Sequence, residues 1–424
     1  MTSEAPRAGR SPLLPIFLVV LVDVMGFTIV YPLLPLYARK FGATPLIATT
    51  LVSVYALCSL LSTPLIGRLS DQYGRRRLLM LSQAGTFAGF IVLGFAGSLW
   101  MLFLGRILDG LTAGNLSLAQ AYISDRTEPQ NRAKAFGIIG IAFGIGFFFG
   151  PAMAGVLSDH GKREHLPFIV AAGLSMLSMI CTYTLLEPGA PPRAAVEAVG
   201  PGGKRPGLFD VDVYLEYFRR PGLGALYLQF FVFCFSFSAF MSGFALFANS
   251  RFAWTSQEVG YMFAYAGFLG IILQGGMLGR LVKKYSEATL ALAGFATAVV
   301  AYCILGLAQT IVVLVVSATI SSFGNGVLRP VITSELTQRV GRHEQGVAIG
   351  ISGSLNSLAM LVAPPVGGLL LNHDWLLGWA MVPAATAALG LIVALAARKR
   401  IAAAKLAAAP ATLPSAVVVA PREP

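Results

Sequence analysis

Long apolar stretches alternate with short polar breaks along almost the whole chain. A helix that spans a bilayer needs about 20 mostly apolar residues, and twelve such stretches lie between breaks that contain charge, Gly or Pro. The predicted spans cover residues 13–37, 46–66, 78–97, 99–123, 135–158, 166–186, 222–248, 258–281, 288–308, 310–334, 346–371 and 376–397. The pattern therefore predicts an all-α integral membrane protein with twelve transmembrane helices.

The longest break, residues 187–220, is rich in Pro, Gly and charge and leaves six spans on each side. We interpret it as a linker between two six-helix bundles. Acids alternate with Tyr and Phe at its end, in 209–220, which predicts a short amphipathic helix at the membrane surface. The predicted organisation is an N-terminal bundle at 1–186, a cytoplasmic linker at 187–220, a C-terminal bundle at 221–397 and a disordered cytoplasmic tail at 398–424.

Short motifs of the first half recur in the second half at a nearly constant offset. IGRL at 66–69 recurs as LGRL at 278–281, and AFGI at 135–138 recurs as AIGI at 348–351. Parallel repeats of this kind predict two pseudo-symmetric bundles, with a substrate site at their interface near the middle of the membrane.

Composition supports the membrane assignment, because a chain that is 56% hydrophobic and 12% charged is too apolar for a water-soluble core. The net charge is +12. Most Lys and Arg residues lie in the loops and tails that the predicted spans place on the same side of the bilayer as the N-terminus. That placement indicates membrane topology rather than nucleic-acid binding. We expect a multi-pass protein of the bacterial inner membrane with both termini in the cytoplasm.

Cysteine and histidine give no sign of a metal or disulfide framework. All four Cys residues lie within predicted spans and all four His residues lie in loops. We expect no metal and no cofactor.

The loop GRLSDQYGRRRLL at 67–79 is the most specific stretch. Its glycines allow a tight turn, Asp71 can accept from an Arg, and the basic cluster suits a cytoplasmic face. The loop resembles the corresponding one of the major facilitator superfamily, which implies the two-bundle fold. The resemblance also implies that Gly67, Asp71, Gly74 and Arg75 latch the halves together. A simple basic turn is the alternative.

Span 4 carries Arg106 and Asp109 within LFLGRILDGLTAG at 102–114, which resembles a second motif of that family. The two residues share a helical face that continues to Gln120. A charge at mid-bilayer costs at least about 2.5 kcal/mol, so it is normally paired or faces a wet cavity. We hypothesise that Arg106 tunes a carboxylate that exchanges a proton. A purely structural ion pair is the alternative.

Span 1 supplies a further carboxylate, Asp23, just before a Gly and Pro pattern that resembles the first span of the family. Burial would favour the protonated form of Asp23, whereas a nearby Arg106 would favour the carboxylate. We predict that Asp23, Arg106 and Asp109 couple transport to protons, with a structural role for Asp23 as the alternative.

Span 5 contains GFFFGPAMAG at 146–155, which is similar to a motif that the family's antiporters carry. Small residues allow close packing, and Pro151 bends the helix. The resemblance implies a conformational hinge at Gly150, Pro151 and Gly155. A generic packing face is the alternative.

Polar and aromatic residues of the second half are candidates for a substrate cavity. Aromatic faces beside a few polar groups suit amphipathic or cationic molecules, while Arg329 suits an anionic group. An aromatic face that packs or meets lipid is the alternative. The predicted cavity residues are Gln120, Gln229, Phe233, Phe237, Gln274, Asn325, Arg329 and Asn356.

Residues 108–125 resemble the tetracycline-resistance branch of the twelve-helix drug:proton antiporters. The resemblance implies a monomeric secondary transporter that exports small amphipathic molecules or drugs in exchange for protons. That branch carries an acid in span 9, whereas 288–308 contains none, so tetracycline is not assigned as the substrate. Proton-coupled uptake of an organic solute or anion and a non-transporting membrane sensor are the alternatives. The absence of a nucleophile and base pair or a phosphate loop argues against an enzyme.

Overall fold

Helices make up the regular structure of the described chain, which comprises residues 13–126, 132–159, 162–186, 211–341 and 344–407 of the computed structural model. The first half contains α1 (Leu13–Val30), α2 (Leu34–Arg39), α3 (Pro45–Tyr73), α4 (Arg75–Gly94), α5 (Leu99–Leu111), α6 (Asn115–Arg126), α7 (Arg132–Ser158) and α8 (Leu166–Leu185). The linker contributes α9 (Val211–Arg219). The second half contains α10 (Leu223–Phe252), α11 (Ser256–Ile272), the π-helical η2 (Leu273–Met277), α12 (Leu278–Lys284), α13 (Glu287–Gly306), α14 (Ile311–Gln338), α15 (Gln345–Asn372) and α16 (Leu376–Ala407).

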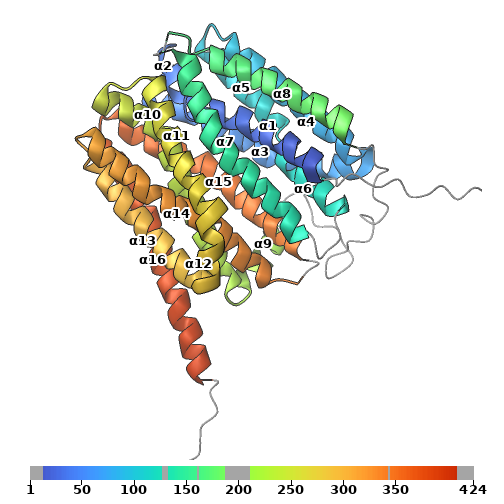
Figure 1. Ribbon diagram of the computed structural model, residues 1–424, viewed down its shortest axis with the longest axis vertical. Helices are drawn as coiled ribbons and strands as arrows, with labels where there is room; N and C mark the ends of the chain where they lie inside the picture. Colours follow the sequence, from blue (N-terminus) through green and yellow to red (C-terminus); the bar gives the residue numbers. More distant parts are fainter. Residues whose placement is uncertain (1–12, 127–131, 160–161, 187–210, 342–343, 408–424) are drawn as a thin grey trace, which may run out of the picture.

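The helices form two bundles, α1–α8 and α10–α16, which lie side by side in Figure 1. Helix α7 packs against α11 and α3 packs against α15, so these two pairs form the boundary between the halves. Eleven helices of the described chain are long and apolar enough to cross a membrane. They agree with all the predicted spans except 99–123, and the all-α, two-bundle prediction is confirmed.

Span 4 was predicted as one continuous helix, and this prediction is wrong. Helix α5 ends at Leu111 and α6 begins at Asn115. Backbone groups freed by a break inside a membrane must find other partners, and hydroxyl groups of neighbouring helices supply them. Ser62 donates to the Gly110 carbonyl at 2.8 Å, and the Gly114 amide donates to Ser82 at 3.0 Å.

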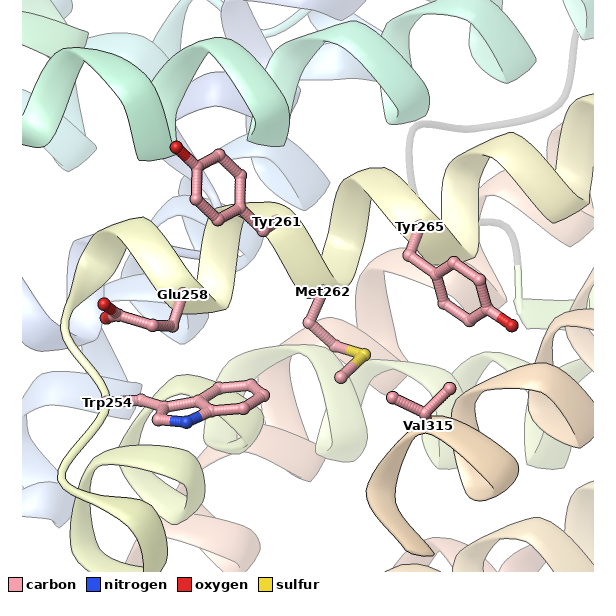
Figure 2. Close-up of a pocket in the computed structure, with 6 residues that line it drawn as sticks. All are labelled: Trp254, Glu258, Tyr261, Met262, Tyr265 and Val315. Atoms are coloured by element: carbon pink, nitrogen blue, oxygen red, sulfur yellow. The ribbon is translucent and has the colours of Figure 1, made fainter. Parts of the chain in front are cut away.

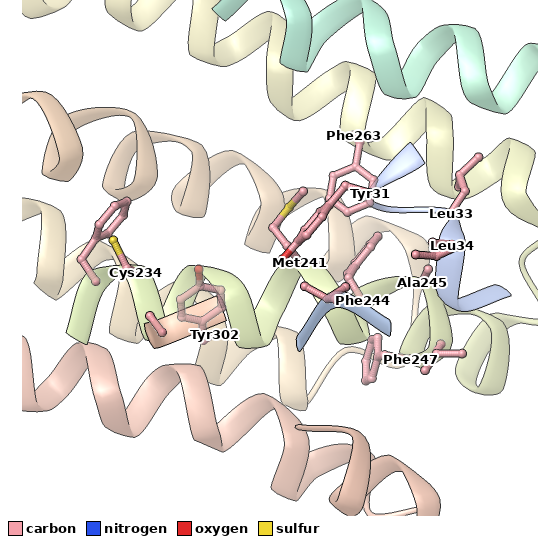
Figure 3. Packing of buried hydrophobic residues seen from close by; sticks show 14 of the residues in the cluster. Tyr31, Leu33, Leu34, Cys234, Met241, Phe244, Ala245, Phe247, Phe263 and Tyr302 are labelled. Atoms are coloured by element: carbon pink, nitrogen blue, oxygen red, sulfur yellow. The ribbon is translucent and has the colours of Figure 1, made fainter. Parts of the chain in front are cut away.

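Span 1 is also interrupted, between Val30 and Leu34, where prolines remove backbone donors. The interruption turns Tyr31, Leu33 and Leu34 toward the second half, where all three are buried. Figure 3 shows them beside side chains of α10 and α11, which include Met241, Phe244, Ala245 and Phe263. The first span therefore joins the two halves through apolar packing.

The two ends of the molecule differ in how closely the halves approach. We call them the Lys40 end, with the loops around Lys40 and Trp254, and the Gly74 end, with the loops around Gly74 and Ser286. At the Lys40 end a Cβ placed on Gly260 would lie 2.5 Å from the Cα of Gly155. The backbones of α7 and α11 thus touch directly.

At the Gly74 end, by contrast, Gly275, Gly276 and Gly350 have open space around their Cα atoms. These glycines lie on η2 and α15, which belong to helices that border the first half. The structure therefore has its halves packed together at the Lys40 end, whereas these three glycines at the Gly74 end have no close neighbour.

Two further predictions concern the linker between the bundles and the tail after the last span. The short helix expected in 209–220 is present as α9, and Arg220 at its end pairs with Glu344 at 2.9 Å. The tail predicted to be disordered from residue 398 instead continues α16 to Ala407. Alanine has the highest helix propensity, and the sequence there is IAAAKLA, which explains the extension. Residues 408–424 lie outside the described chain.

We expect Gly260→Val to open the Lys40 end, because the added side chain would overlap the backbone of α7. Overpacking of this kind costs about 1 to 3 kcal/mol, enough to shift the equilibrium between arrangements about tenfold. The measurement is the distance between spin labels on Gly97→Cys and Gln309→Cys, in a variant without the native cysteines. Gly270→Val is the control, since Gly270 has open space around it. An unchanged distance distribution in Gly260→Val would contradict the expectation.

Candidate functional site

A buried ion pair lies on α5 in the first half. Arg106 Nη2 is 2.9 Å from Asp109 Oδ2, and the two side chains are 3% and 6% exposed. Charges with so little access to water are stabilised only by partners within the protein. The surrounding helices must therefore supply the groups that stabilise both charges.

Glycines bring α5 close enough to its neighbours to enclose this pair. A Cβ on Gly89 of α4 would lie 2.9 Å from the Gly105 carbonyl, and one on Gly110 would lie 2.7 Å from the Tyr55 carbonyl of α3. Helices that approach this closely leave no room for larger residues. The glycine positions are the reason that the pair is shielded by α3 and α4.

The Arg106 guanidinium lies between aromatic rings, 5.4 Å from the centre of Tyr55 and 5.7 Å from that of Phe90. Cation–π contacts of this kind partly replace water around the charge. Nε of Arg106 has no hydrogen-bond partner among the described residues, while Nη2 faces Asp109. The cation is thus held in place while part of its donor capacity stays unused.

Asp23 faces the interior of the same bundle from α1. Gln83 of α4 and Ser178 of α8 lie beside its carboxyl group, and Gln83 Nε2 donates to Ser178 Oγ at 2.8 Å. Asp23 Oδ1 is shielded from solvent and has no hydrogen-bond partner within the described chain. Such an orphaned carboxyl oxygen is suited to hold a proton.

The structure brings the three predicted proton-coupling residues together in one half, since Asp23 is close enough to Asp109 for electrostatic interaction. Thr86 of α4 also hydrogen-bonds to Asp109. Two carboxyl groups, one cation and several hydroxyl and amide groups therefore form a buried polar cluster. This cluster can hold, exchange or relay protons.

The predicted cavity residues occupy several different environments. Gln229 and Phe233 are buried on α10, and Asn325 accepts a 3.4 Å hydrogen bond from Tyr302. Gln120 on α6 and Asn356 on α15 are half-buried, and the Asn356 amide points toward Met360 of its own helix. The remaining polar pair, Gln274 and Arg329, is exposed. The predicted cavity residues therefore include buried, half-buried and exposed side chains.

The aromatic run on α10 divides into two parts. Phe237 stacks on Phe233 with centroids 6.1 Å apart and meets Phe147 of α7 at 6.3 Å, so this part lies at the boundary between the halves. Phe240 and Phe244 pack against Phe263 of α11, and Phe244 also lies in the buried cluster that contains Tyr31 and Leu34 of the first half. Both parts therefore border the first half, through different helices.

The predicted latch residues contact one another within the first half. Arg75 pairs with Asp71 and with Asp125, the latter at 3.0 Å. Gly74 has a φ of 94°, which a side chain would strain, and joins α3 to α4. Gly67 has open space around it. In this arrangement the loop ties α3, α4 and α6 together.

The predicted hinge residues lie where α7 touches both α1 and α11. Thr28 of α1 donates to the Gly146 carbonyl at 2.8 Å, and a Cβ on Gly150 would collide with the Thr28 side chain. Gly155 meets Gly260 of α11 across the boundary. The Gly and Pro positions of α7 are therefore occupied by close helix contacts, on one face within the half and on the other between the halves.

Sequence reasoning missed the contact made by Glu164 at the Lys40 end. Glu164 Oε2 lies 3.2 Å from Lys40 Nζ in the first half, and Ser256 of α11 donates to Oε1 at 3.3 Å. These groups line a cavity of about 350 Å³ together with Arg39 and Asn249. A lone acid in a loop gives no sequence signal, because only the fold brings Lys40 and Ser256 to it.

A second cavity of about 280 Å³ lies within the second half (Figure 2). Trp254 lines it from the loop before α11, Tyr261, Met262 and Tyr265 line it from α11, and Val315 of α14 lines it from the other side. None of these residues comes from the first half. It is therefore separate from the boundary where the substrate site is predicted.

Comparison with known proteins bears on the whole chain. A family model described as Major Facilitator Superfamily matches residues 16–309 and 226–419. The chain is 30% identical to the tetracycline resistance protein, class B, of Escherichia coli, over 85% of this chain and 91% of that protein.

Solved structures give the same fold. The crystal structure of the human organic anion transporter MFSD10 (TETRAN) superposes with a TM-score of 0.70 at 21% identity, covering 90% of this chain and 98% of that one. A bacterial homologue of the human lysosomal transporter Spinster, in an inward-facing and unoccupied conformation, gives a TM-score of 0.72 at 17% identity. That match covers 92% of this chain and 97% of the other.

We expect low pH to favour closure of the Lys40 end, because closure favours the protonated form of Glu164. Burial raises the pKa of Glu164 above its ordinary value of 4.5, and Lys40 and Ser256 offset this only in part. An open end would expose Glu164 to water and restore the ordinary pKa, so closing takes up protons. Above pH 4.5 the fraction of molecules whose Lys40 end is closed should therefore fall as pH rises.

The label pair on Gly97→Cys and Gln309→Cys measures this fraction between pH 4.5 and 8. Glu164→Gln, which cannot titrate, should remove the part of the pH dependence that Glu164 carries. Asp374→Asn is the matched control, because Asp374 is an exposed acid at the same end. An identical pH profile in wild type and Glu164→Gln would rule out this role for the residue.

Proposed function

This chain belongs to the major facilitator superfamily and is a multi-pass membrane transporter, and from that premise we propose that it exports small amphipathic molecules in exchange for protons. The proposal further takes the Gly74 end and both termini to lie in the cytoplasm of a bacterial cell, at the inner membrane. The energy source is the proton gradient, with no cofactor and no enzymatic step. The working unit is a monomer.

The observation that carries the proposal is the buried cluster of Asp23, Arg106 and Asp109. Ionisable groups inside membrane helices are expensive, and they commonly mark proton or ion pathways. A structural ion pair alone would need one acid for one Arg, whereas this cluster has two carboxyl groups beside one cation. The second carboxyl group, with its unpartnered oxygen, is the one free to take up a proton.

The arrangement of the halves supports alternating access. Under the proposed topology the closed Lys40 end faces outward and the Gly74 end faces the cytoplasm, where a substrate for export must enter. The backbone contact of Gly155 with Gly260 and the apolar packing of Tyr31 close the outer side. Rocking of the bundles would open that side and close the other.

Proton-coupled uptake remains the second candidate, because the same charged cluster would serve a symporter. It differs from export in the relative direction of substrate and proton. A test that measures both fluxes in one preparation therefore separates the two mechanisms. A non-transporting membrane sensor would give no substrate flux at all.

We expect Asp23→Asn and Asp109→Asn to lower proton-driven export at least about tenfold, because neither amide can carry a proton. A screen of tetracycline, ethidium and 1-naphthalenesulfonate, in cells that lack their own pumps, first identifies a transported compound. Liposomes containing the full chain and a pH-sensitive dye then report substrate and proton movement together.

Asp212→Asn is the control, because Asp212 is an exposed acid on α9. Asp23→Glu keeps a titratable group and should retain part of the flux. Substrate and protons moving in the same direction would contradict antiport. Flux at the wild-type level in both amide variants would contradict the role of the cluster.

A further inference from the structure

Arg329 is a charged residue within membrane-spanning α14 that the buried cluster does not use. Its guanidinium lies 5.8 Å from the ring centre of Phe143, on α7 of the other half. It also interacts electrostatically with Cys234 on α10. Arg329 is nevertheless exposed, so its side chain faces accessible space between the halves rather than the packed core.

The guanidinium has no carboxylate partner among the described residues. The acids near the ends of α13 and α14 are engaged elsewhere, since Glu335 pairs with Arg339 and Glu287 accepts from Ser334 and Gln338. Arg106 in the first half, by contrast, has Asp109. A cation within a membrane span normally has a counter-ion or borders water. Arg329 therefore has a charge that an incoming anion can neutralise.

The π-helical turn η2 places a second polar group beside this position. Single π-helical turns within α-helices are rare and occur frequently at functional sites. Gln274 lies in this turn, with its Nε2 3.9 Å from a Cβ placed on Gly326, one turn before Arg329 on α14. Its Oε1 is 4.0 Å from a Cβ placed on Gly144, the residue after Phe143.

Gln274 and Arg329 thus approach the same two helices, α7 and α14, from neighbouring positions. Together they offer amide and guanidinium donors, and the guanidinium fork matches the oxygens of a carboxylate or sulfonate. The aromatic groups nearby are Phe143 and, farther along α7, Phe147, which meets Phe237. A charged head can therefore bind beside an apolar, ring-lined surface.

We propose that Arg329 and Gln274 bind the anionic group of an amphipathic organic anion whose apolar part contacts Phe143 and Phe147. The proposal rests on the proposed transport function and specifies its substrate class as aromatic carboxylates or sulfonates. The phosphate headgroup of an anionic lipid has the same chemistry, so the experiment must distinguish it from a free anion.

The test measures equilibrium binding of 1-naphthalenesulfonate to the purified full chain in lipid nanodiscs, without a proton gradient. Arg329→Gln should weaken binding at least about tenfold, because charge-assisted hydrogen bonds are lost. Arg329→Lys should restore part of the affinity, since it keeps the charge but not the fork. Gln274→Ala should have a smaller effect of the same sign.

Two controls make the result specific. The neutral analogue 1-naphthalenesulfonamide should bind the wild type weakly, and Arg329→Gln should leave its affinity unchanged if the variant is folded. Arg280→Gln removes an exposed cation at the same end of the molecule and should leave sulfonate binding unchanged. Equal sulfonate affinity in wild type and Arg329→Gln would overturn the proposal, as would equal affinity for sulfonate and sulfonamide in the wild type.

Nanodiscs of neutral phosphatidylcholine and of anionic phosphatidylglycerol separate the two sources of anion. Equal sulfonate affinity in both lipids supports a site for free anions. Weaker binding in phosphatidylglycerol, with the difference lost in Arg329→Gln, would assign the site to a lipid headgroup and overturn the substrate assignment. Because no flux is measured, failure of this test is distinguishable from failure of proton-driven export.

Discussion

The enclosure of Arg106 and Asp109 by α3 and α4 is the constraint on which the first half depends. An ion pair of this kind is tolerable only if the surrounding helices approach closely, and glycines on α4 and α5 allow that approach. The same close packing leaves the break between α5 and α6 with hydroxyl partners from α3 and α4. Burial of the ion pair and hydrogen bonding of the free backbone groups thus both require that α3 and α4 pack closely against α5.

The two halves share a fold but differ in the chemistry that they carry. The first half holds two shielded carboxyl groups and a paired cation, whereas the second half presents an aromatic surface and a cation, Arg329, that has no carboxylate partner among the described residues. Under the proposed function, this division would separate proton exchange from ligand contact. Coupling between them must then pass through the shared boundary, where α7 touches α11 and α3 touches α15.

The sequence was sufficient for the fold because hydrophobic spans, charge placement and the repeat are properties of the chain itself. It also singled out Asp23 and Asp109, since charge inside an apolar span is conspicuous, and the structure brings them together, while their role in proton coupling stays a prediction. The break in span 4 was not predictable, because it depends on hydroxyl groups that Ser62 and Ser82 bring from other helices. Glu164 was missed for a similar reason, since its partners lie in two other segments of the chain.

The contact of Gly155 with Gly260 has a consequence for the energetics of closure. A seam made of glycine backbone has no side chains to order when it forms, so this contact itself costs no side-chain conformational entropy. It also offers little attractive surface that would hold the seam shut. Holding this end closed is therefore left to the apolar packing of Tyr31, Leu33 and Leu34 against the second half and to the hydrogen bond from Ser256 to Glu164.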